Sequence, residues 1–192
     1  MPNQPIDTSL LDRAIIFAVR AHAGTERRGK GFPYIVHPLE VVSIISTMTA
    51  DQELLAAAAL HDVVEDTEIS LDQIRAEFGP RIADIVAVET DRIDPAQSAA
   101  DSWMARKQAG LRRLEHASRE VKMVALGDKL SNLRAIARDV AQQGEGFWNL
   151  FHVSDPAIHA WRFRALADAL RELEDTFAFR EFEQLIQEVF PQ

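Results

Sequence analysis

The sequence predicts an all-α protein folded as a helical bundle, and three observations support this fold class. Apolar residues recur at helical spacing over most of the chain, whereas its short β-branched runs do not alternate cleanly between turns. Many of the periodic segments follow a Ser, Thr or Asp residue that can cap a helix. With 47% apolar residues among 192, the chain can also bury a substantial core. We therefore expect a single domain over residues 1–192.

The N-terminal half of the chain is expected to contain five helices. Apolar residues from Leu11 to Ala21 keep helical spacing, and Thr8 or Ser9 can cap that helix. Pro38 stands where a first-turn proline would open the next helix, through LEVVSIIS. The other three are expected at residues 52–65 after a capping Asp51, at LDQIRAEF between a capping Ser70 and Gly79-Pro80, and at residues 81–88.

The C-terminal half is expected to contain four helices. Helical spacing of apolar residues places them at residues 102–118, 119–139, 157–172 and 175–189. Three segments without such spacing are expected to be loops, at residues 24–33, 91–101 and 142–156.

The composition excludes several classes of function. A net charge of −9 disfavours nonspecific binding to nucleic acid or to anionic lipid. No apolar run approaches the roughly 20 residues that cross a bilayer, and the first residues lack the basic-then-apolar pattern of a secretion signal. Because the chain has no cysteine, disulfides, thiolate nucleophiles and cysteine zinc sites are excluded. We therefore expect a cytoplasmic protein.

Two polar pairs interrupt the most apolar stretch of the chain, LLAAAALHDVVEDT. On one continuous helix, His61 and Glu65 are four residues apart, as are Asp62 and Asp66, so all four side chains would share one side. Buried ionisable groups are costly unless they are paired, hydrogen-bonded or bound to metal. Three carboxylates beside one imidazole lack positive charge, which a divalent cation can supply. This pattern indicates a metal site.

Two further residues are candidate metal ligands. His37, in PYIVHPLE, lies between two prolines that restrict the backbone at the entrance of a helix. Asp128 lies in the apolar segment VKMVALGDKLSNLRAI, with Asn132 on the same helical face. Each candidate also has a simpler interpretation. A lone histidine at a helix start often caps or packs, and a buried aspartate often pairs with a neighbouring lysine, here Lys129.

A basic cluster stands out against the acidic background of the chain. Arg27, Arg28 and Lys30 lie close together in the glycine-flanked segment AGTERRGKGFPY. A solvated basic loop is the simpler interpretation of such a cluster taken alone. Its position a few residues before His37 favours a phosphate-binding role.

Together these motifs resemble the hydrolase domain of the RelA/SpoT homologue family, which belongs to the HD superfamily. The resemblance is carried by FAVRAHAGTERRGKGFPYIVHPLEV, AAALHDVVEDT and VKMVALGDKLSNLR, and it spans about Phe17 to Arg138. Within the family the chain is most similar to the small, single-domain alarmone hydrolases, because it has no room for a synthetase or regulatory domain. The resemblance implies an HD-domain helical bundle.

The resemblance also implies a role for each candidate residue. His37, His61, Asp62 and Asp128 match the four ligands of one metal ion, typically Mn²⁺ in this family. The residues by themselves suit Mn²⁺, Fe²⁺ or Zn²⁺. Glu65 and Asp66 match the two acids that act on water. Arg27 or Arg28, with Lys30, matches the basic segment that contacts phosphates. Asn132 matches the asparagine that lies against the nucleotide. One of the two catalytic carboxylates is expected to have a raised pKa, because adjacent acids near a metal cannot all ionise without cost.

The implied activity is metal-dependent removal of the 3′-pyrophosphate from the guanosine alarmones ppGpp and pppGpp, with release of pyrophosphate. A second hypothesis is an HD-type phosphatase or phosphodiesterase acting on adenosine alarmones, nucleoside monophosphates or a phosphorylated dinucleotide cofactor. A third is a nucleotide-binding regulator without turnover, which the presence of Glu65 and Asp66 disfavours. The sequence leaves open the nucleobase, the number of 5′-phosphates, the native metal and the oligomeric state.

Overall fold

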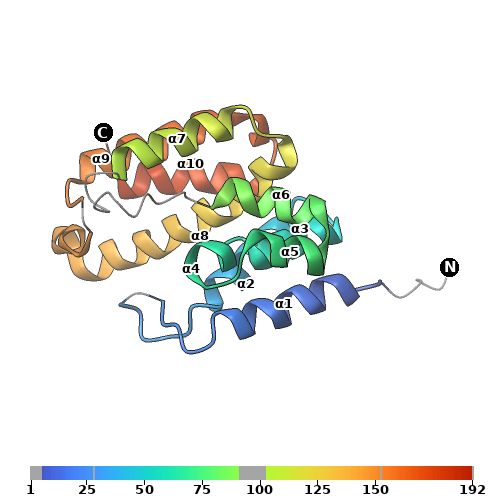
Figure 1. Ribbon diagram of the computed structural model, residues 1–192. Coiled ribbons are helices and arrows are strands. Elements are labelled where there is room, and N and C mark those ends of the chain that lie inside the picture. Colours follow the sequence, from blue (N-terminus) through green and yellow to red (C-terminus); the bar gives the residue numbers. More distant parts are fainter. Residues whose placement is uncertain (1–5, 28, 91–102, 152, 192) are drawn as a thin grey trace. The chain divides into compact units, whose positions relative to one another are not determined.

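The computed structural model describes residues 6–27, 29–90, 103–151 and 153–191, and the regular elements within these ranges are all helices (Figure 1). The all-α prediction is therefore confirmed. The chain divides into two compact units, Met1–Thr90 and Asp91–Gln192. The expectation of one domain over residues 1–192 stays a prediction, and the loop expected at 91–101 lies outside the described residues.

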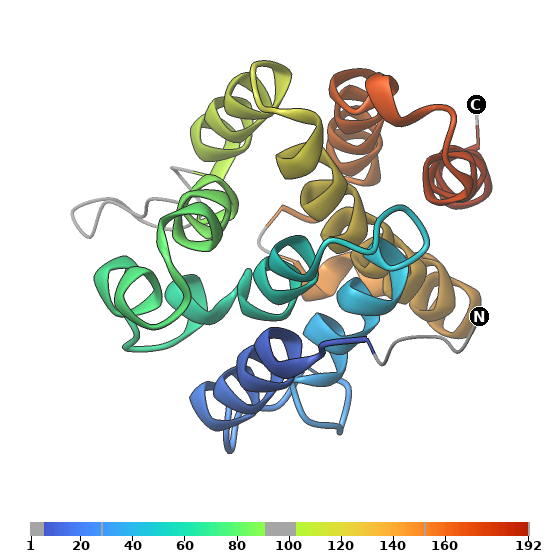
Figure 2. The ribbon, with the colours of Figure 1, turned by 90° about the vertical axis from the view of Figure 1, so that its right-hand side faces the viewer.

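The first unit is built around α3 (Gln52–Leu60), in which every residue from Leu54 to Leu60 is buried. The other helices of this unit are α1 (Ser9–Ala21), α2 (Val36–Ile45), α4 (Val63–Asp66), α5 (Leu71–Phe78) and α6 (Pro80–Glu89). Helices α1, α2 and α6 pack against α3, and α5 packs against α6, as the blue-to-green helices of Figure 2 show. The unbroken apolar run of α3 thus forms the centre of the core of this unit.

Most helix boundaries in the first unit follow the signals expected from the sequence. Asp51 caps α3 by accepting a backbone hydrogen bond, and Ser70 starts α5 with a reciprocal capping box. Gly79 ends α5 with a φ of 90°, and α6 begins directly at Pro80. Helix α2 begins at Val36, so that Pro38 lies in its first turn as predicted.

The continuous helix expected at residues 52–65 is wrong. Helix α3 ends at Leu60, a turn follows at His61 and Asp62, and the four-residue α4 begins at Val63. Both turn residues keep helical dihedral angles, with φ and ψ of −56° and −36° at His61 and −97° and −4° at Asp62. His61 Nδ1 lies 2.8 Å from the carbonyl oxygen of Ala58, so the side chain occupies an acceptor of the last turn of α3. The four polar residues consequently do not share the face of one helix.

The second unit is built around its longest helix, α8 (Arg119–Gln143). The other elements are α7 (Trp103–Glu115), the 3₁₀ helix η1 (Gly144–Leu150), α9 (Pro156–Ala169), the 3₁₀ helix η2 (Arg171–Leu173) and α10 (Phe177–Val189). Helices α7 and α10 and the 3₁₀ helices η1 and η2 contact α8, while α9 contacts α7 and α10. The four helices expected in this half are present with shifted ends, since α8 continues past residue 139 and α9 ends before residue 172.

The loop expected at residues 142–156 contains η1. Phe147 and Trp148 within it are 4% and 5% exposed, because their rings pack into the core of the second unit. Burial of these two rings stabilises the helical conformation of η1, although its glycines do not favour a helix. Within the described residues, no helix combines the length and the apolar character needed to span a membrane.

Candidate metal centre

The loop before α2 fixes where His37 lies. Glu26 and Pro33 form an isolated antiparallel bridge, and the Tyr34 backbone N–H donates to the Thr25 carbonyl at 2.9 Å. Gly31, with a φ of 71°, lies in the turn between them, and its backbone N–H donates to the Glu26 side chain at 2.8 Å. This closed loop leads directly into α2, in which His37 is the second residue.

The basic cluster predicted to bind phosphate lies on the same loop. The Arg27 guanidinium carbon lies 5.1 Å from the centroid of the Tyr34 ring, a cation–π distance. The Lys30 backbone N–H donates to the Arg27 carbonyl at 2.8 Å. Arg28 lies outside the described residues. Within the described part of the basic cluster, the Arg27 side chain therefore contacts Tyr34, three residues before the candidate ligand His37.

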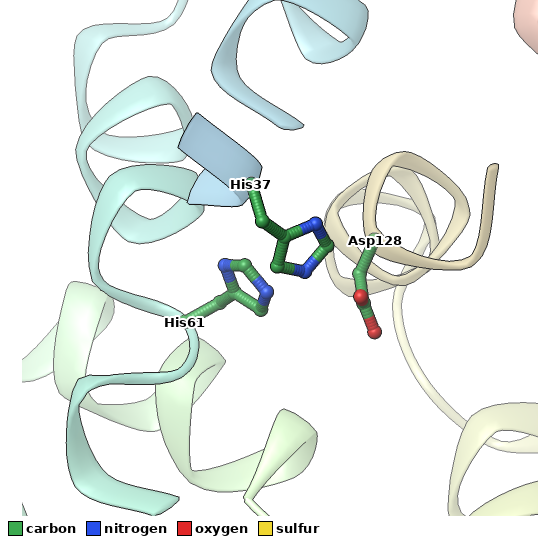
Figure 3. Close-up of side chains that lie close together, drawn as sticks. All are labelled: His37, His61 and Asp128. Atoms are coloured by element: carbon green, nitrogen blue, oxygen red, sulfur yellow. The ribbon is translucent and has the colours of Figure 1, made fainter. Parts of the chain in front are cut away.

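Three of the predicted metal ligands come together in the first unit. His37 Nε2 and His61 Nε2 lie 3.4 Å and 3.0 Å from the same atom, Oδ2 of Asp62. The two imidazole rings are 5.1 Å apart and nearly perpendicular (Figure 3). Both histidines are buried, with exposed fractions of 3% and 1%. Residues from α2 and from the turn after α3 thus meet at one carboxylate oxygen.

The hydrogen bond between His61 Nδ1 and the Ala58 carbonyl determines which ring nitrogen of His61 can accept. The Ala58 carbonyl can only accept, so Nδ1 of His61 carries the ring proton. In the neutral ring, Nε2 then presents a lone pair towards a carboxylate oxygen 3.0 Å away. Two acceptors at this distance need a cation between them, either a proton or a metal. A backbone carbonyl that sets the tautomer in this way is typical of metal-binding histidines.

The predicted catalytic carboxylates Glu65 and Asp66 lie on α4, immediately after the candidate ligands, and both residues are exposed. Although the Asp66 residue as a whole is exposed, its carboxyl group is partly desolvated, which raises its pKa. The hydrogen bond with the Tyr34 hydroxyl lowers this pKa, and the nearby charge of Asp62 raises it. The direction for Asp66 agrees with the expectation of one raised pKa, and its largest cause is desolvation, not the neighbouring acid.

Tyr34 is a site residue whose role the sequence did not predict. Its hydroxyl donates to Asp62 Oδ2 at 2.6 Å. Burial, together with the negative charge of Asp62, raises the pKa of the Tyr34 phenol far above its ordinary value. The hydroxyl therefore remains a donor. No local sequence pattern connects Tyr34 with Asp62, so this contact had no signal before the fold.

His22 is a second residue beside the site whose role the sequence did not predict. Its ring lies 4.8 Å from the Tyr34 ring and is 3% exposed. Neither ring nitrogen has a hydrogen-bond partner within the described part of the chain. Burial lowers the pKa of His22 from its usual value, which favours the neutral ring.

The remaining predicted site residues, Asp128 and Asn132, lie together on α8 of the second unit. The Asp128 side chain, also drawn in Figure 3, belongs to a residue that is only 6% exposed. The Asn132 amide donates to one carboxylate oxygen of Asp128, and the Lys129 ammonium donates to the other. The shared helical face was expected, and the pairing with Lys129 is the contact that the simpler interpretation of Asp128 named. The predicted site residues thus fall into two groups, one in each unit.

These observations can be compared with known protein families. Residues 14–151 match the family described as HD domain. The chain belongs to the HD domain family. The match extends across the division between the two units, and it agrees with the histidine and aspartate pattern that the sequence presents. The predicted HD-domain helical bundle is confirmed.

Two curated relatives place this HD domain beside the RelA/SpoT homologues, which confirms the resemblance. The guanosine-3′,5′-bis(diphosphate) 3′-pyrophosphohydrolase MESH1 of Danio rerio is 35% identical over 134 residues, covering 68% of this chain and 71% of that protein. The GTP pyrophosphokinase rsh of Brucella abortus (strain 2308) is 35% identical over 136 residues, covering 68% of this chain. The matched region is only 17% of that longer protein.

A solved structure shares the fold of this HD domain over nearly its whole length. It is a metazoan ortholog of SpoT that hydrolyses ppGpp, and it matches with a TM-score of 0.76 at 24% sequence identity. The match covers 99% of each chain. At this identity the likeness establishes the fold.

Proposed function

We propose that this HD domain is a guanosine-3′,5′-bis(diphosphate) 3′-pyrophosphohydrolase that acts on ppGpp and pppGpp and releases pyrophosphate. The observation that carries the proposal is the convergence of His37 and His61 on the Asp62 carboxylate, followed directly by the acids of α4. The MESH1 relative, of which this chain matches 71%, bears the name of the same activity.

The proposed metal ligands are His37, His61, Asp62 and, from the second unit, Asp128. The first two and Asp128 are all buried, and each offers an atom that can ligate a metal. Two imidazoles with two carboxylates suit Mn²⁺, which is the metal we propose. When bound, a divalent metal would supply a water of lowered pKa and polarise a phosphate oxygen.

Glu65 and Asp66 would act on the attacking water. We propose that they orient it towards the phosphorus attached to the ribose 3′-oxygen and accept one of its protons. The water oxygen forms a bond to that phosphorus while the bond from phosphorus to the 3′-oxygen breaks. The 3′-oxygen takes up a proton and becomes a hydroxyl, and the two phosphates are released as pyrophosphate. The raised pKa of Asp66 suits proton acceptance, because a stronger base takes a proton from water more readily.

The loop before α2 would hold the phosphates of the substrate. Arg27, Arg28 and Lys30 supply positive charge that offsets the charge developing on the pyrophosphate. The chain as a whole carries a net charge of −9, so this loop is where a polyanion would be attracted. Asn132 is proposed to contact the nucleotide, and guanine is the proposed base.

A product assay tests the function directly. The purified, Mn²⁺-loaded protein would be incubated with guanosine and adenosine 3′,5′-polyphosphates, and with 5′-monophosphates as controls. We expect pyrophosphate and a guanosine 5′-polyphosphate from the first substrate, with no orthophosphate from the monophosphates. Orthophosphate released from the monophosphates, with intact polyphosphates, would identify a different phosphatase. Equal or greater cleavage of the adenosine substrate would contradict the choice of guanine.

A further inference from the structure

The Tyr34 hydroxyl donates to a particular atom of the candidate centre. Its acceptor, Asp62 Oδ2, is also the atom that lies 3.0 Å and 3.4 Å from the Nε2 atoms of His61 and His37. A donor 2.6 Å from Oδ2 restricts rotation of the Asp62 carboxylate about its Cβ–Cγ bond. The hydroxyl therefore determines which Asp62 oxygen faces the two imidazoles.

Asp62 needs such an external restraint because of where it lies. It stands in the turn between α3 and α4, and its side chain makes no capping hydrogen bond to the start of α4. The side chain is 18% exposed, whereas the two histidine side chains are 2% and 0% exposed. Packing thus fixes the histidines more completely than it fixes the carboxylate.

Tyr34 is itself held in place from several directions. Its backbone N–H donates to the Thr25 carbonyl, and its carbonyl accepts from the His37 backbone N–H, both at 2.9 Å. The ring of His22 lies 4.8 Å from its ring, and the guanidinium of Arg27 lies 5.1 Å from the ring centroid. The phenol therefore connects the basic loop with the candidate metal ligands.

We propose that Tyr34 is a positioning residue with two separable tasks: its hydroxyl orients Asp62 for the metal, and its ring orients Arg27 for the phosphates. The first task follows from the hydrogen bond to Oδ2, and the second from the cation–π contact. The second task rests on the proposed function, whereas the first concerns metal binding alone. Substitutions that remove the hydroxyl only, or the hydroxyl and the ring together, separate the two tasks.

The first task is tested without any substrate. Mn²⁺ would be titrated calorimetrically into metal-free full-length protein, as wild type, Tyr34→Phe and Thr67→Val. Loss of a residue that orients a metal ligand typically weakens affinity by about 10–100-fold, which is the change expected for Tyr34→Phe. Thr67→Val is the matched control, because it deletes a hydroxyl that bonds to the Val63 carbonyl at 2.6 Å, close to Asp62 in the chain. Its Mn²⁺ affinity should equal that of the wild type.

Thermal melting of the metal-free variants shows whether each is folded before titration. A folded Tyr34→Phe protein that binds Mn²⁺ as tightly as the wild type would overturn the first task. Equal weakening in Thr67→Val would also overturn it, because any lost hydroxyl in this region would then have the same effect. Should Tyr34→Phe not fold, Tyr34→Leu offers the same comparison, since it also removes the hydroxyl that donates to Asp62 Oδ2. Retained wild-type affinity in that variant would equally contradict the proposal.

The second task is tested by kinetics at saturating Mn²⁺. Tyr34→Phe keeps an aromatic ring under Arg27, so its KM for the alarmone should stay near the wild-type value once the metal site is filled. Tyr34→Leu removes the ring, and its KM should rise several-fold above that of Tyr34→Phe. Equal KM values for the two variants would contradict the role of the ring. Absence of hydrolysis by the wild type would contradict the proposed function and leave the Mn²⁺ result intact.

Discussion

At the scale of single residues, the state of His61 determines what the candidate centre can bind. Its Nδ1 is committed to the Ala58 carbonyl at 2.8 Å, so its Nε2 faces Asp62 as a lone pair. The same carboxylate receives the Tyr34 hydroxyl, which stays protonated because burial and the Asp62 charge raise its pKa. His61 Nε2 and Asp62 Oδ2 are thus two acceptors 3.0 Å apart, and such a pair favours a cation between them.

Glu65→Gln tests whether Glu65 acts in turnover without binding the metal. The substitution leaves His37, His61 and Asp62 untouched, so Mn²⁺ affinity measured by titration should be unchanged. Turnover of ppGpp should fall by about 10²–10⁴-fold, as loss of a general base does. Glu68→Gln is the matched control, since Glu68 is also exposed and follows α4, and it should keep wild-type turnover. Near-normal turnover of Glu65→Gln would remove Glu65 from the mechanism.

At the scale of elements, the loop between α1 and α2 joins the basic cluster to the metal ligands. Its bridge between Glu26 and Pro33 and the hydrogen bond from Gly31 to Glu26 hold the loop closed. Gly31 has a φ of 71°, in the left-handed region that residues with a Cβ rarely adopt. The position of His37 in α2 and that of Arg27 on the loop thus depend on the same turn.

Gly31→Ala tests this dependence. A left-handed conformation costs an alanine about 1–2 kcal/mol, so the free energy of unfolding should fall by about that amount in urea denaturation. The KM for the alarmone should rise, because the basic residues lose their fixed places. Gly146→Ala is the matched control, since its added Cβ would meet nothing within 4 Å and its φ is not in the left-handed region. Equal stability losses in both variants would show that the turn at Gly31 carries no special strain.

At the scale of the whole molecule, the proposed metal ligands are divided between the two compact units. The first unit, whose core is centred on α3, contains His37, His61 and Asp62, and the second contains Asp128 on α8. The HD domain match covers residues 14–151 and so includes the proposed ligands of both units. Metal binding would then stabilise the folded chain as a whole, because unfolding destroys the site.

Asp128→Asn tests whether the second unit supplies a ligand. Mn²⁺ at about 100 times its Kd should raise the unfolding free energy of the wild type by about 2.7 kcal/mol, and EDTA should abolish the gain. At the same Mn²⁺ concentration, Asp128→Asn should show a much smaller gain. Asp139→Asn is the control, because Asp139 is another buried acid of α8 and should leave the gain from Mn²⁺ intact. Equal gains in wild type and Asp128→Asn would exclude Asp128 as a ligand.

The helical class, most helix starts and the family can be predicted from the amino-acid sequence alone. These properties depend on local patterns, such as the capping Asp51 and Ser70, the glycine-proline stop after α5 and the HD pair at His61 and Asp62. A capping side chain and its backbone partner are within a few residues of each other, so the sequence displays both. The candidate ligands could be identified in the same way, because histidine and aspartate in apolar segments stand out against their neighbours.

The end of α3 at Leu60, the folding of η1 and the contact between Tyr34 and Asp62 depend on tertiary contacts and could not be predicted from the sequence. The last of these joins residues 28 positions apart, and η1 is ordered by rings that enter the core of the second unit. Such outcomes depend on which distant groups a side chain meets, and no periodicity or capping pattern encodes that. The orientation of Asp62 therefore depends on the contact between the loop before α2, which carries Tyr34, and the turn after α3, which carries Asp62.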